Sequence, residues 1–244
     1  MSEKKILLEG KDVVKRFGGL TAVNKASMEV REGEIIGLIG PNGAGKTTLF
    51  NMFSGSFQPT SGDVIFGGTN ITKMKPNQIC RLGIGRTFQI VQPFENLTVL
   101  ENTMVGALIN TNSVHEARDK AEEVLEFVGL KERAHSRGSE LGLQFLKRME
   151  MARALATEPK LLLLDEVMAG LNPSASVEVI ELVQKIRDSG VTVLIIEHIM
   201  KAVMTLSDRI YVLSQGSMIA HGIPQDVVKD PEVIKSYLGE KKHA

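Results

Sequence analysis

Short apolar runs alternate along the chain with longer stretches in which apolar residues recur every three or four positions. The short runs predict buried strands, at 5–9, 27–31, 35–39, 63–66, 161–165, 191–197 and 209–213. The periodic stretches predict helices, at 46–55, 174–188 and 198–206. Strands separated by helices indicate an α/β fold whose sheet is parallel over at least part of its width.

The middle of the chain has a different pattern. From about residue 90 to 156 the periodicity is helical, with segments at 99–109 and 114–128 and a long stretch ending in Ala152-Arg153-Ala154-Leu155. We therefore expect a helical subdomain inserted into an α/β core. The predicted division is 1–89 for the first part of the core, 90–156 for the helical subdomain and 157–244 for the second part of the core.

Composition narrows the class of protein. The 244 residues suit one α/β core with a small insertion, and Lys plus Arg equals Asp plus Glu at 29 each, so no bulk charge indicates a nucleic-acid partner. The single cysteine, Cys80, and the lack of a secretory signal favour the cytoplasm. The longest apolar runs fall short of the roughly 18 residues that span a bilayer, so a membrane association would need a partner.

A glycine-rich segment carries the strongest chemical signal. Gly40-Pro41-Asn42-Gly43-Ala44-Gly45-Lys46-Thr47 fits the pattern G-x-x-x-x-G-K-[ST] between an apolar strand and a helix. Glycine lets the main chain curl around a phosphate, and the helix N-terminus adds a positive end. We expect Lys46 to reach the β- and γ-phosphates of ATP and Thr47 to bind Mg²⁺. The predicted nucleotide-binding residues of this loop are Gly40, Asn42, Gly43, Ala44, Gly45, Lys46, Thr47 and Thr48.

Two later strands end in residues suited to the same chemistry. The apolar run at 161–164 is followed by Asp165 and Glu166, at the strand end where ligand sites of α/β sheets lie. Asp165 is predicted to hold Mg²⁺, and Glu166 to orient or deprotonate an attacking water. The second strand, at 191–196, is followed by Glu197-His198. His198 is either a contact to the γ-phosphate or an ordinary histidine of the core or the surface.

The order of these motifs resembles the ABC ATPases. The resemblance implies that Gln89, after Gly85-Arg86-Thr87-Phe88, contacts Mg²⁺ and senses a membrane partner. It implies that Phe17, 29 residues before Lys46, stacks on adenine. The catalytic residues that it implies are Glu166, His198, Lys46 and Gln89, and the Mg²⁺ ligands are Thr47, Gln89 and Asp165.

Narrower stretches resemble the larger ATPase subunit of branched-chain amino acid importers. They are 17–23, 85–91, 93–102 and Ala169-Gly170-Leu171-Asn172-Pro173. The resemblance implies import of branched-chain or other hydrophobic amino acids from the cytoplasmic face of the membrane. It also implies transmembrane permease subunits, docked beside the segment 89–101, and indirectly a substrate-binding protein. Phe88 and Phe94 either line that docking groove or pack in the core. Another small substrate or a lipid is the alternative cargo.

The signature motif of the family, Leu-Ser-Gly-Gly-Gln, is not intact. Counting back from Ala152 places it on Leu141-Gly142-Leu143-Gln144-Phe145, with Gly142 in the serine position. A gap of one residue would instead align Gly142 with the second glycine. In the family this motif begins a helix and meets the γ-phosphate of the opposite subunit. Val167 and Asn172 also replace the usual proline and aspartate.

The altered signature leads to a prediction about assembly. We expect a heterodimer in which a second ATPase subunit supplies an intact signature to the phosphate loop of this chain. A homodimer would have two impaired sites. The alternatives are a tolerated variant of the motif, and a nucleotide-gated dimerisation clamp that hardly turns over. A soluble ABC protein of repair or translation would need coiled-coil arms or a second ATPase domain, and the chain has neither.

Overall fold

The computed structural model describes residues 4–238, which pack as two compact units. The first unit consists of Met1–Ile79 and Thr192–Ala244, and the second of Cys80–Val191. The division into core and helical subdomain at residues 90 and 156 stays a prediction, because the packing boundaries lie elsewhere in the chain. Each unit is described by itself below.

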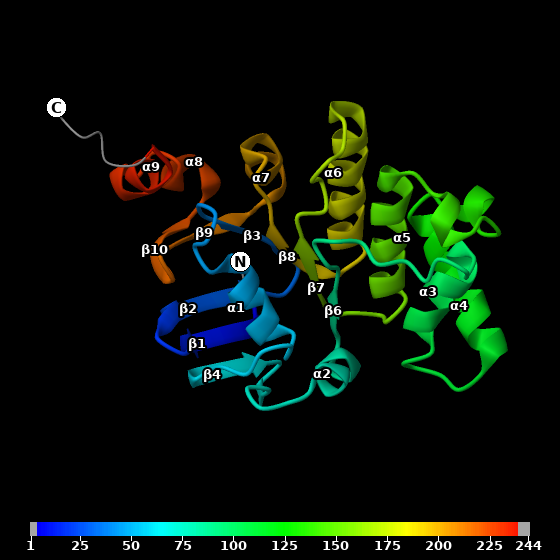
Figure 1. Cartoon of the computed structure of the whole chain (residues 1–244), viewed down its shortest axis with the longest axis horizontal. Coiled ribbons are helices and arrows are strands. Elements are labelled where there is room, and N and C mark those ends of the chain that lie inside the picture. Colours follow the sequence, from blue (N-terminus) through cyan, green and yellow to red (C-terminus); the bar gives the residue numbers. More distant parts are fainter. Residues whose placement is uncertain (1–3, 239–244) are drawn as a thin grey trace. The chain divides into compact units, whose positions relative to one another are not determined.

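The first unit contains an antiparallel sheet with the strand order β2-β1-β4-β5. Its strands are β1 (Ile6–Phe17), β2 (Leu20–Arg31), β4 (Ser61–Phe66) and β5 (Thr69–Asn70). Figure 1 shows β1 in blue between β2 and β4. The strands predicted at 5–9 and 27–31 are the outer ends of this β1–β2 hairpin, which is much longer than predicted. Charged residues facing solvent interrupt its apolar pattern, and the β1–β2 register shifts at several points.

The first unit also contains the predicted parallel strands. β3 (Ile35–Ile39) pairs in parallel with β8 (Thr192–Ile196) on one side and with β9 (Arg209–Ser214) on the other. β10 (Ser217–Gly222) then adds to β9 in the antiparallel direction. Every residue of β3 and β8 is buried, as expected for parallel strands covered on both faces. The expectation of a partly parallel sheet is confirmed.

Helices follow these strands in the chain. α1 (Lys46–Phe53) begins shortly after β3, and α7 (Met200–Leu206) lies between β8 and β9. The C-terminal part adds α8 (Pro224–Val227) and α9 (Pro231–Leu238). α2 (Pro76–Leu82) was not predicted, because its seven residues bury only one side chain, that of Ile79, and so show no apolar period.

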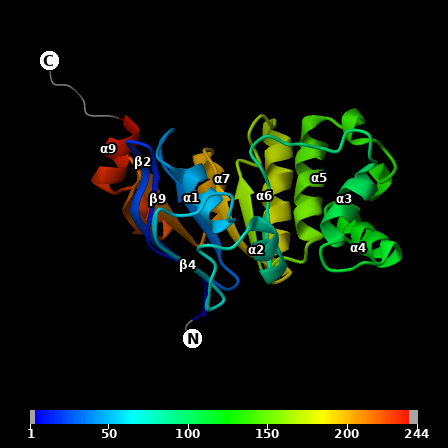
Figure 2. The same ribbon diagram turned by 60° about the horizontal axis from the view of Figure 1, so that its bottom comes forward.

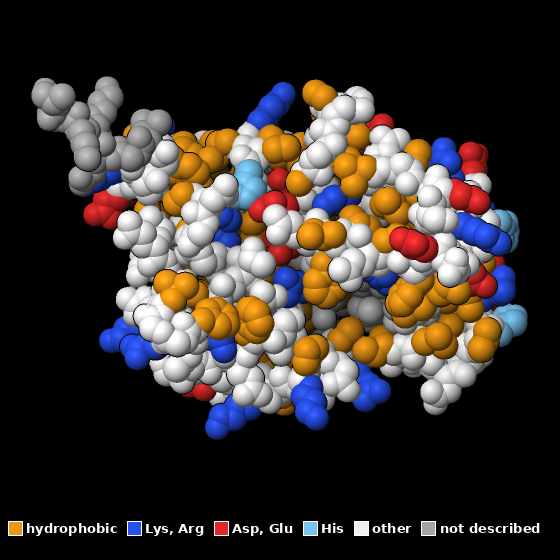
Figure 3. All heavy atoms as spheres, viewed as in Figure 1, with side chains coloured by type: hydrophobic (Ala, Val, Ile, Leu, Met, Phe, Trp, Pro, Cys, Tyr) orange, Lys and Arg blue, Asp and Glu red, His pale blue; other side chains and the backbone are white. Residues whose placement is uncertain are grey.

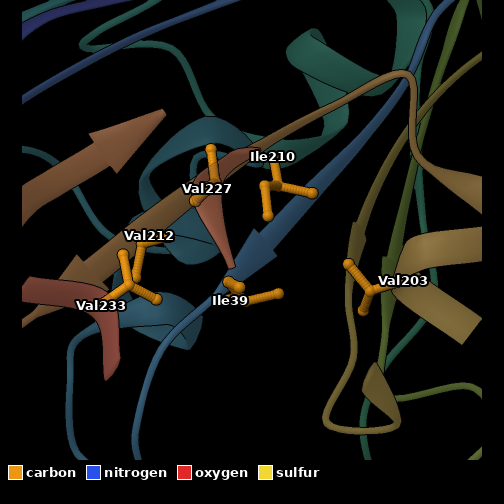
Figure 4. Close-up of a cluster of buried hydrophobic side chains, with 6 residues drawn as sticks. All are labelled: Ile39, Val203, Ile210, Val212, Val227 and Val233. Carbon is orange, nitrogen blue, oxygen red and sulfur yellow. The ribbon is translucent and has the colours of Figure 1, made fainter. Parts of the chain in front are cut away.

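Six β-branched side chains form a core beneath the C-terminal helices. They come from β3, α7, β9, α8 and α9, and are Ile39, Val203, Ile210, Val212, Val227 and Val233 (Figure 4). Each is at most 5% exposed. Full burial of one such side chain stabilises a fold by about 1.5–3 kcal/mol. This core fixes the C-terminal end of β3, from which the glycine-rich loop leaves.

The second unit combines two parallel strands with helices. β6 (Ile84–Arg86) pairs with β7 (Leu161–Asp165) in parallel. The main helices are α3 (Val99–Ala107), α4 (Val114–Phe127), α5 (Leu143–Leu155) and α6 (Pro173–Asp188), with short 3₁₀ turns at Lys131–Arg133 and Gly138–Glu140. Figure 2 shows α5 between α6 and the α3–α4 pair. The helices predicted at 99–109, 114–128 and 174–188 are confirmed, with ends that differ by at most two residues.

Side chains cap most helices of this unit at the N-terminus. Thr98 forms a reciprocal capping box with Glu101 at the start of α3, and Ser113 accepts the Glu116 N–H at the start of α4. Asn172 accepts the Ala175 N–H at 2.8 Å at the start of α6. α5 is different, because its N-cap is Gly142 and no side chain caps it.

Within residues 4–238, none of the helices has both the length and the apolar character that crossing a bilayer requires.

Candidate functional site

The glycine-rich loop of the first unit has a main chain that only glycine can adopt at two positions. Gly40 has φ +150° and Gly45 has φ +103°. A Cβ at Gly40 would lie 2.0 Å from the carbonyl oxygen of Leu213, and one at Gly45 would lie 2.4 Å from that of Ala22. Both are hard contacts with main chain, so neither glycine can be replaced without moving the backbone. The loop is therefore wedged tightly between β9 and β2.

The lysine of the motif is held inside this loop. Lys46 is only 6% exposed, and its Nζ donates to the main-chain oxygens of Gly40 at 2.7 Å and Pro41 at 3.0 Å. The Thr47 side chain is exposed. A hollow of about 740 Å³ adjoins the loop and is also lined by the β9–β10 turn and by α9. A buried ammonium beside glycine main chain and an exposed hydroxyl form a set of donors suited to phosphate oxygens.

Phe17 ends β1 and keeps much of its ring surface open. It is 43% exposed, and Phe57 packs against it in an edge-to-face arrangement with centroids 5.4 Å apart. The Nζ of Lys15 lies 5.1 Å from the centroid of Phe17. The ring is thus supported at its edge by Phe57, and it has free area on which a planar base could stack.

Asp165 ends β7 in the second unit and is completely buried. Its Oδ2 lies 3.5 Å from Nη2 of Arg86, whereas its buried Oδ1 has no hydrogen-bond partner among the described residues. Burial raises the pKa of Asp165 above its usual value, and the charge of Glu166 adds to that effect, while Arg86 opposes it. A buried carboxylate oxygen without a donor is a natural ligand for a cation or an ordered water.

Glu166 has an unusual backbone and a specific partner. Its φ is +50°, in the left-handed region that non-glycine residues seldom adopt. Nε2 of Gln89 donates to Oε2 of Glu166 at 2.8 Å. The carbonyl of Glu166 accepts the N–H of Ala169 at 3.1 Å, which closes a turn directly after the strand. Three residues predicted from sequence, Gln89, Asp165 and Glu166, therefore lie together in the second unit.

One face of α5 holds the loop that carries Gln89, and sequence analysis missed this. Lys147 Nζ donates to the carbonyl of Gln89 at 3.1 Å, Oε1 of Glu150 accepts the N–H of Phe88 at 2.8 Å, and Nη1 of Arg153 donates to the carbonyl of Gln92 at 3.1 Å. Lys147, Glu150 and Arg153 are spaced by three residues and so share a helix face. In the sequence, this face could have been found from the three charged residues of alternating sign, spaced by three positions among apolar neighbours.

Burial of Glu150 predicts a pH dependence of stability. Burial raises the pKa of Glu150 above its usual value, although the Phe88 N–H and the charges of Arg153 and Lys147 oppose the shift. The folded state therefore binds this proton more tightly than the unfolded state. Its contribution to stability is greatest at low pH and decreases as the pH rises from the usual pKa through the raised one.

We expect Glu150→Gln to remove this decrease, because its amide oxygen still accepts the Phe88 N–H but carries no charge. Glu150→Ala should instead lower the free energy of unfolding by about 1–3 kcal/mol, since the Phe88 N–H loses its acceptor. Denaturant unfolding between about pH 4 and pH 8 measures both effects. The same pH slope in wild type and Glu150→Gln would contradict this assignment.

The remaining predicted residues are divided between the units. His198 follows β8 in the first unit and is exposed. The segment predicted as the signature lies at the start of α5 in the second unit, where Leu141 is buried, Gly142 and Leu143 are exposed, and Gln144 is half-buried. The Phe145 ring packs under the guanidinium of Arg133, with 3.9 Å between the guanidinium carbon and the ring centroid.

Fold and motifs together define a P-loop ATPase cassette, and comparison with known proteins supports that class. The family model described as ABC transporter matches residues 23–169, more than half of the chain, and the chain belongs to this family. It is an ATP-binding subunit that hydrolyses ATP. A second family model, described as branched-chain amino acid ATP-binding cassette transporter, matches residues 217–243.

Individual relatives cover nearly the whole chain. The high-affinity branched-chain amino acid transport ATP-binding protein LivG of Salmonella typhimurium is 43% identical, over 98% of this chain and 100% of the relative. The corresponding protein BraF of Pseudomonas aeruginosa is 42% identical, over 96% and 98%. The fold is similar to a crystal structure of an ABC transporter cassette in its ADP conformation. That pair has a TM-score of 0.88 and 34% identity, with 97% of this chain and 100% of the other covered.

Proposed function

We propose that this chain powers an importer of branched-chain or other hydrophobic amino acids by hydrolysing ATP. ATP hydrolysis is supported mainly by the cluster of Gln89, Glu166 and Asp165. Within this cluster, the buried Oδ1 of Asp165 has no hydrogen-bond donor among the described residues. The named cargo of LivG and BraF, and the match at 217–243, support the choice of cargo.

ATP would be bound by residues of the first unit. Lys46 would exchange its contacts with the loop carbonyls for the β- and γ-phosphates, and Phe17 would stack on the adenine. The remaining phosphate contacts would come from main chain and hydroxyl groups of the loop, namely Gly40, Asn42, Gly43, Ala44, Gly45, Thr47 and Thr48.

Mg²⁺ fits the donors that the chain offers. No cluster of three or more His, Cys, Asp or Glu side chains suited to a metal occurs in residues 4–238. Mg²⁺ does not need such a cluster, because it is usually held by one or two carboxylates together with waters and substrate phosphates. Asp165, Thr47 and Gln89 are the proposed ligands. When bound, the ion would neutralise charge that develops on the phosphate oxygens.

Glu166 is the proposed base that orients or deprotonates the attacking water, and His198 the residue that contacts the γ-phosphate. The hydrogen bond from Gln89 fixes the position of the Glu166 carboxylate. Because Gln89 lies on a loop held by α5, a partner that moves this loop would also move the carboxylate. This is a direct physical route from a membrane subunit to the rate of hydrolysis.

The start of α5 supports an unequal dimer. Gly142 is the N-cap, so it has no hydroxyl to donate to an approaching phosphate and no side-chain oxygen to accept the first N–H groups of the helix. We propose that a second ATPase subunit completes the phosphate loop of this chain with an intact signature. The site formed by Leu141–Phe145 and the partner's phosphate loop would hydrolyse ATP slowly.

An apolar surface around the Gln89 loop is the proposed docking surface for a transmembrane permease. The side chains proposed for it are Phe88, Ile90 and Phe94 of the loop and Val105 and Leu108 of α3 and its C-cap, each between 41% and 74% exposed. Figure 3 shows hydrophobic side chains gathered over the region of α3. Exposed apolar groups that cluster in this way mark interaction sites. Docking there would place the chain at the cytoplasmic face of the membrane, with a substrate-binding protein reached only through the permease.

Ile90, the most exposed of these side chains at 74%, provides the test. We expect Ile90→Asp to abolish co-purification with the permease while leaving ATP binding to the isolated subunit unchanged. The control is Val114→Asp, on α4, because Val114 is 64% exposed and lies in the first turn of a helix, where an acidic residue is tolerated. Co-purification that survives Ile90→Asp would contradict the docking surface.

A further inference from the structure

Lys147 lies on the face of α5 that holds the Gln89 loop, and it is more deeply buried than Arg153 on the same face. It is 4% exposed, and its ammonium is stabilised by main-chain carbonyls. Burying an ammonium costs several kcal/mol unless its donors are satisfied. A methionine of similar length would fill the same space without that cost. The charge and the donors therefore call for an explanation beyond packing.

The two acceptors of Lys147 are the residues that the hydrolytic site needs. Its Nζ donates to the carbonyl of Gln89 and to the carbonyl of Glu166, both at 3.1 Å. The side chains of Gln89 and Glu166 are joined in turn by their own hydrogen bond of 2.8 Å. Lys147 thus closes a ring of three hydrogen bonds that fixes both the main chain and the side chains of this pair.

The bond to the Glu166 carbonyl acts on a strained position. Glu166 has φ +50°, a conformation that costs a residue with a Cβ roughly 1–2 kcal/mol. Such conformations persist only where the surroundings determine them strongly. Lys147 Nζ and the N–H of Ala169 both donate to this carbonyl, and Lys147 does so from a different element of the fold, α5.

The position of Lys147 along α5 connects this ring to the N-terminal end of the helix. Gly142, the N-cap, lies five residues earlier, and the segment between them is the first turn of a regular helix. A displacement of that end moves Lys147 as well, because a helix turn is nearly rigid. Glu150 and Arg153, further along the same face, hold the loop at Phe88 and Gln92, so that the loop follows the helix.

We propose that Lys147 is a positioning residue that couples the N-terminal end of α5 to Gln89 and Glu166. Nucleotide held by the partner subunit would press on the start of α5, and Lys147 would carry that displacement to the glutamate of this chain's own site. The two nucleotide sites of the dimer would then be linked within one subunit. This inference rests on the proposed roles of Glu166 and of the start of α5.

The test compares ATP hydrolysis by the assembled transporter carrying Lys147→Met, Lys147→Arg or Lys185→Met. We expect Lys147→Met to lower kcat about 10- to 100-fold with KM for ATP within about twofold of wild type, because misplacing a catalytic group slows chemistry without loosening substrate. Lys147→Arg, which keeps the charge and donors, should recover most of that loss. Lys185 also donates to a main-chain carbonyl, that of Phe127, but lies outside the ring, so Lys185→Met should leave kcat unchanged.

A double-mutant cycle with Gln89→Ala separates positioning from general stability. If Lys147 acts through Gln89, the effect of Lys147→Met on kcat is smaller in the Gln89→Ala background than in wild type. Equal effects in both backgrounds would overturn the part of the inference that runs through the Gln89 side chain, and a kcat of Lys147→Met within about twofold of wild type would overturn all of it. Should Lys147→Met fail to fold, Lys147→Gln replaces it in both measurements with the same expectations. Glu166→Gln is measured in the same assay. If Glu166→Gln retains full turnover, the proposed function is wrong. If Glu166→Gln is inactive while Lys147→Met is fully active, only the inference about Lys147 is wrong.

Discussion

We expect Glu166→Gln in the assembled transporter to lower the rate of ATP hydrolysis by about 10²- to 10⁴-fold and to leave ATP binding intact. The amide keeps the size of the carboxylate and still accepts the hydrogen bond from Gln89 Nε2. It cannot take a proton from water at neutral pH. The change therefore removes the proposed chemistry while preserving the local structure. Phosphate release and equilibrium nucleotide binding measure the two halves of this expectation.

Glu181→Gln is the matched control, because Glu181 is an exposed carboxylate on α6 in the same unit. It should hydrolyse ATP at the wild-type rate. With the partner subunit and ATP present, Glu166→Gln should also accumulate as a closed dimer, visible as an earlier elution on size exclusion. Wild-type turnover by Glu166→Gln would remove this glutamate from its proposed role.

We expect Gly142→Ser to raise ATP hydrolysis at the proposed site between the Leu141–Phe145 segment and the phosphate loop of a partner ATPase. The structure shows room for the change, because Gly142 has φ −67° and ψ 159° and an added Cβ meets nothing within 4 Å. Serine at this N-cap supplies the missing hydroxyl donor. A single well-placed donor to transition-state charge is worth roughly 10²- to 10³-fold at most, and we expect at least about a tenfold gain. To isolate the effect, the complex also carries Glu166→Gln in this chain, which inactivates the site at this chain's own phosphate loop. The turnover that remains then comes from the site that contains Gly142→Ser.

The same substitution has a second consequence that does not depend on catalysis. Serine is among the best N-cap residues, and replacing glycine adds a side-chain acceptor for the first N–H groups of α5, worth a few tenths of a kcal/mol of stability. Thermal unfolding of the isolated subunit should therefore show a slightly raised midpoint. A stabilised variant with no gain in turnover would mean that the altered signature does not limit hydrolysis, and that the unequal-dimer account is wrong.

The phosphate-loop geometry could be predicted because its chemistry is local. Gly40 and Gly45 must be glycine for reasons that concern the main chain around them, and the pattern of the motif states those reasons directly. Asp165 and Glu166 were predictable for a similar reason, since a buried strand presents its last residues at the edge of a sheet. The helices α3, α4 and α6 followed from their apolar periodicity.

Features that depend on distant contacts could not be predicted. Lys147 appears in the sequence as one more charge in a helix, and only the folded chain brings it to the carbonyls of residues 58 and 19 positions away. The length of the β1–β2 hairpin was hidden in a similar way, because its solvent-facing side is rich in charged residues. β6, of three residues, is too short to show any period, and its pairing with β7 defines it.

The ATPase rate of this subunit with Mg²⁺, measured alone and then mixed with its partner ATPase, decides whether the two nucleotide sites of the dimer are unequal. We expect weak hydrolysis by the subunit alone, because both sites of a homodimer would use the altered Leu141–Phe145 segment. We expect a sharp rise on mixing, because the partner would then supply an intact signature to the phosphate loop around Lys46. Robust hydrolysis by the subunit alone would contradict the account and show that the altered segment works as it stands.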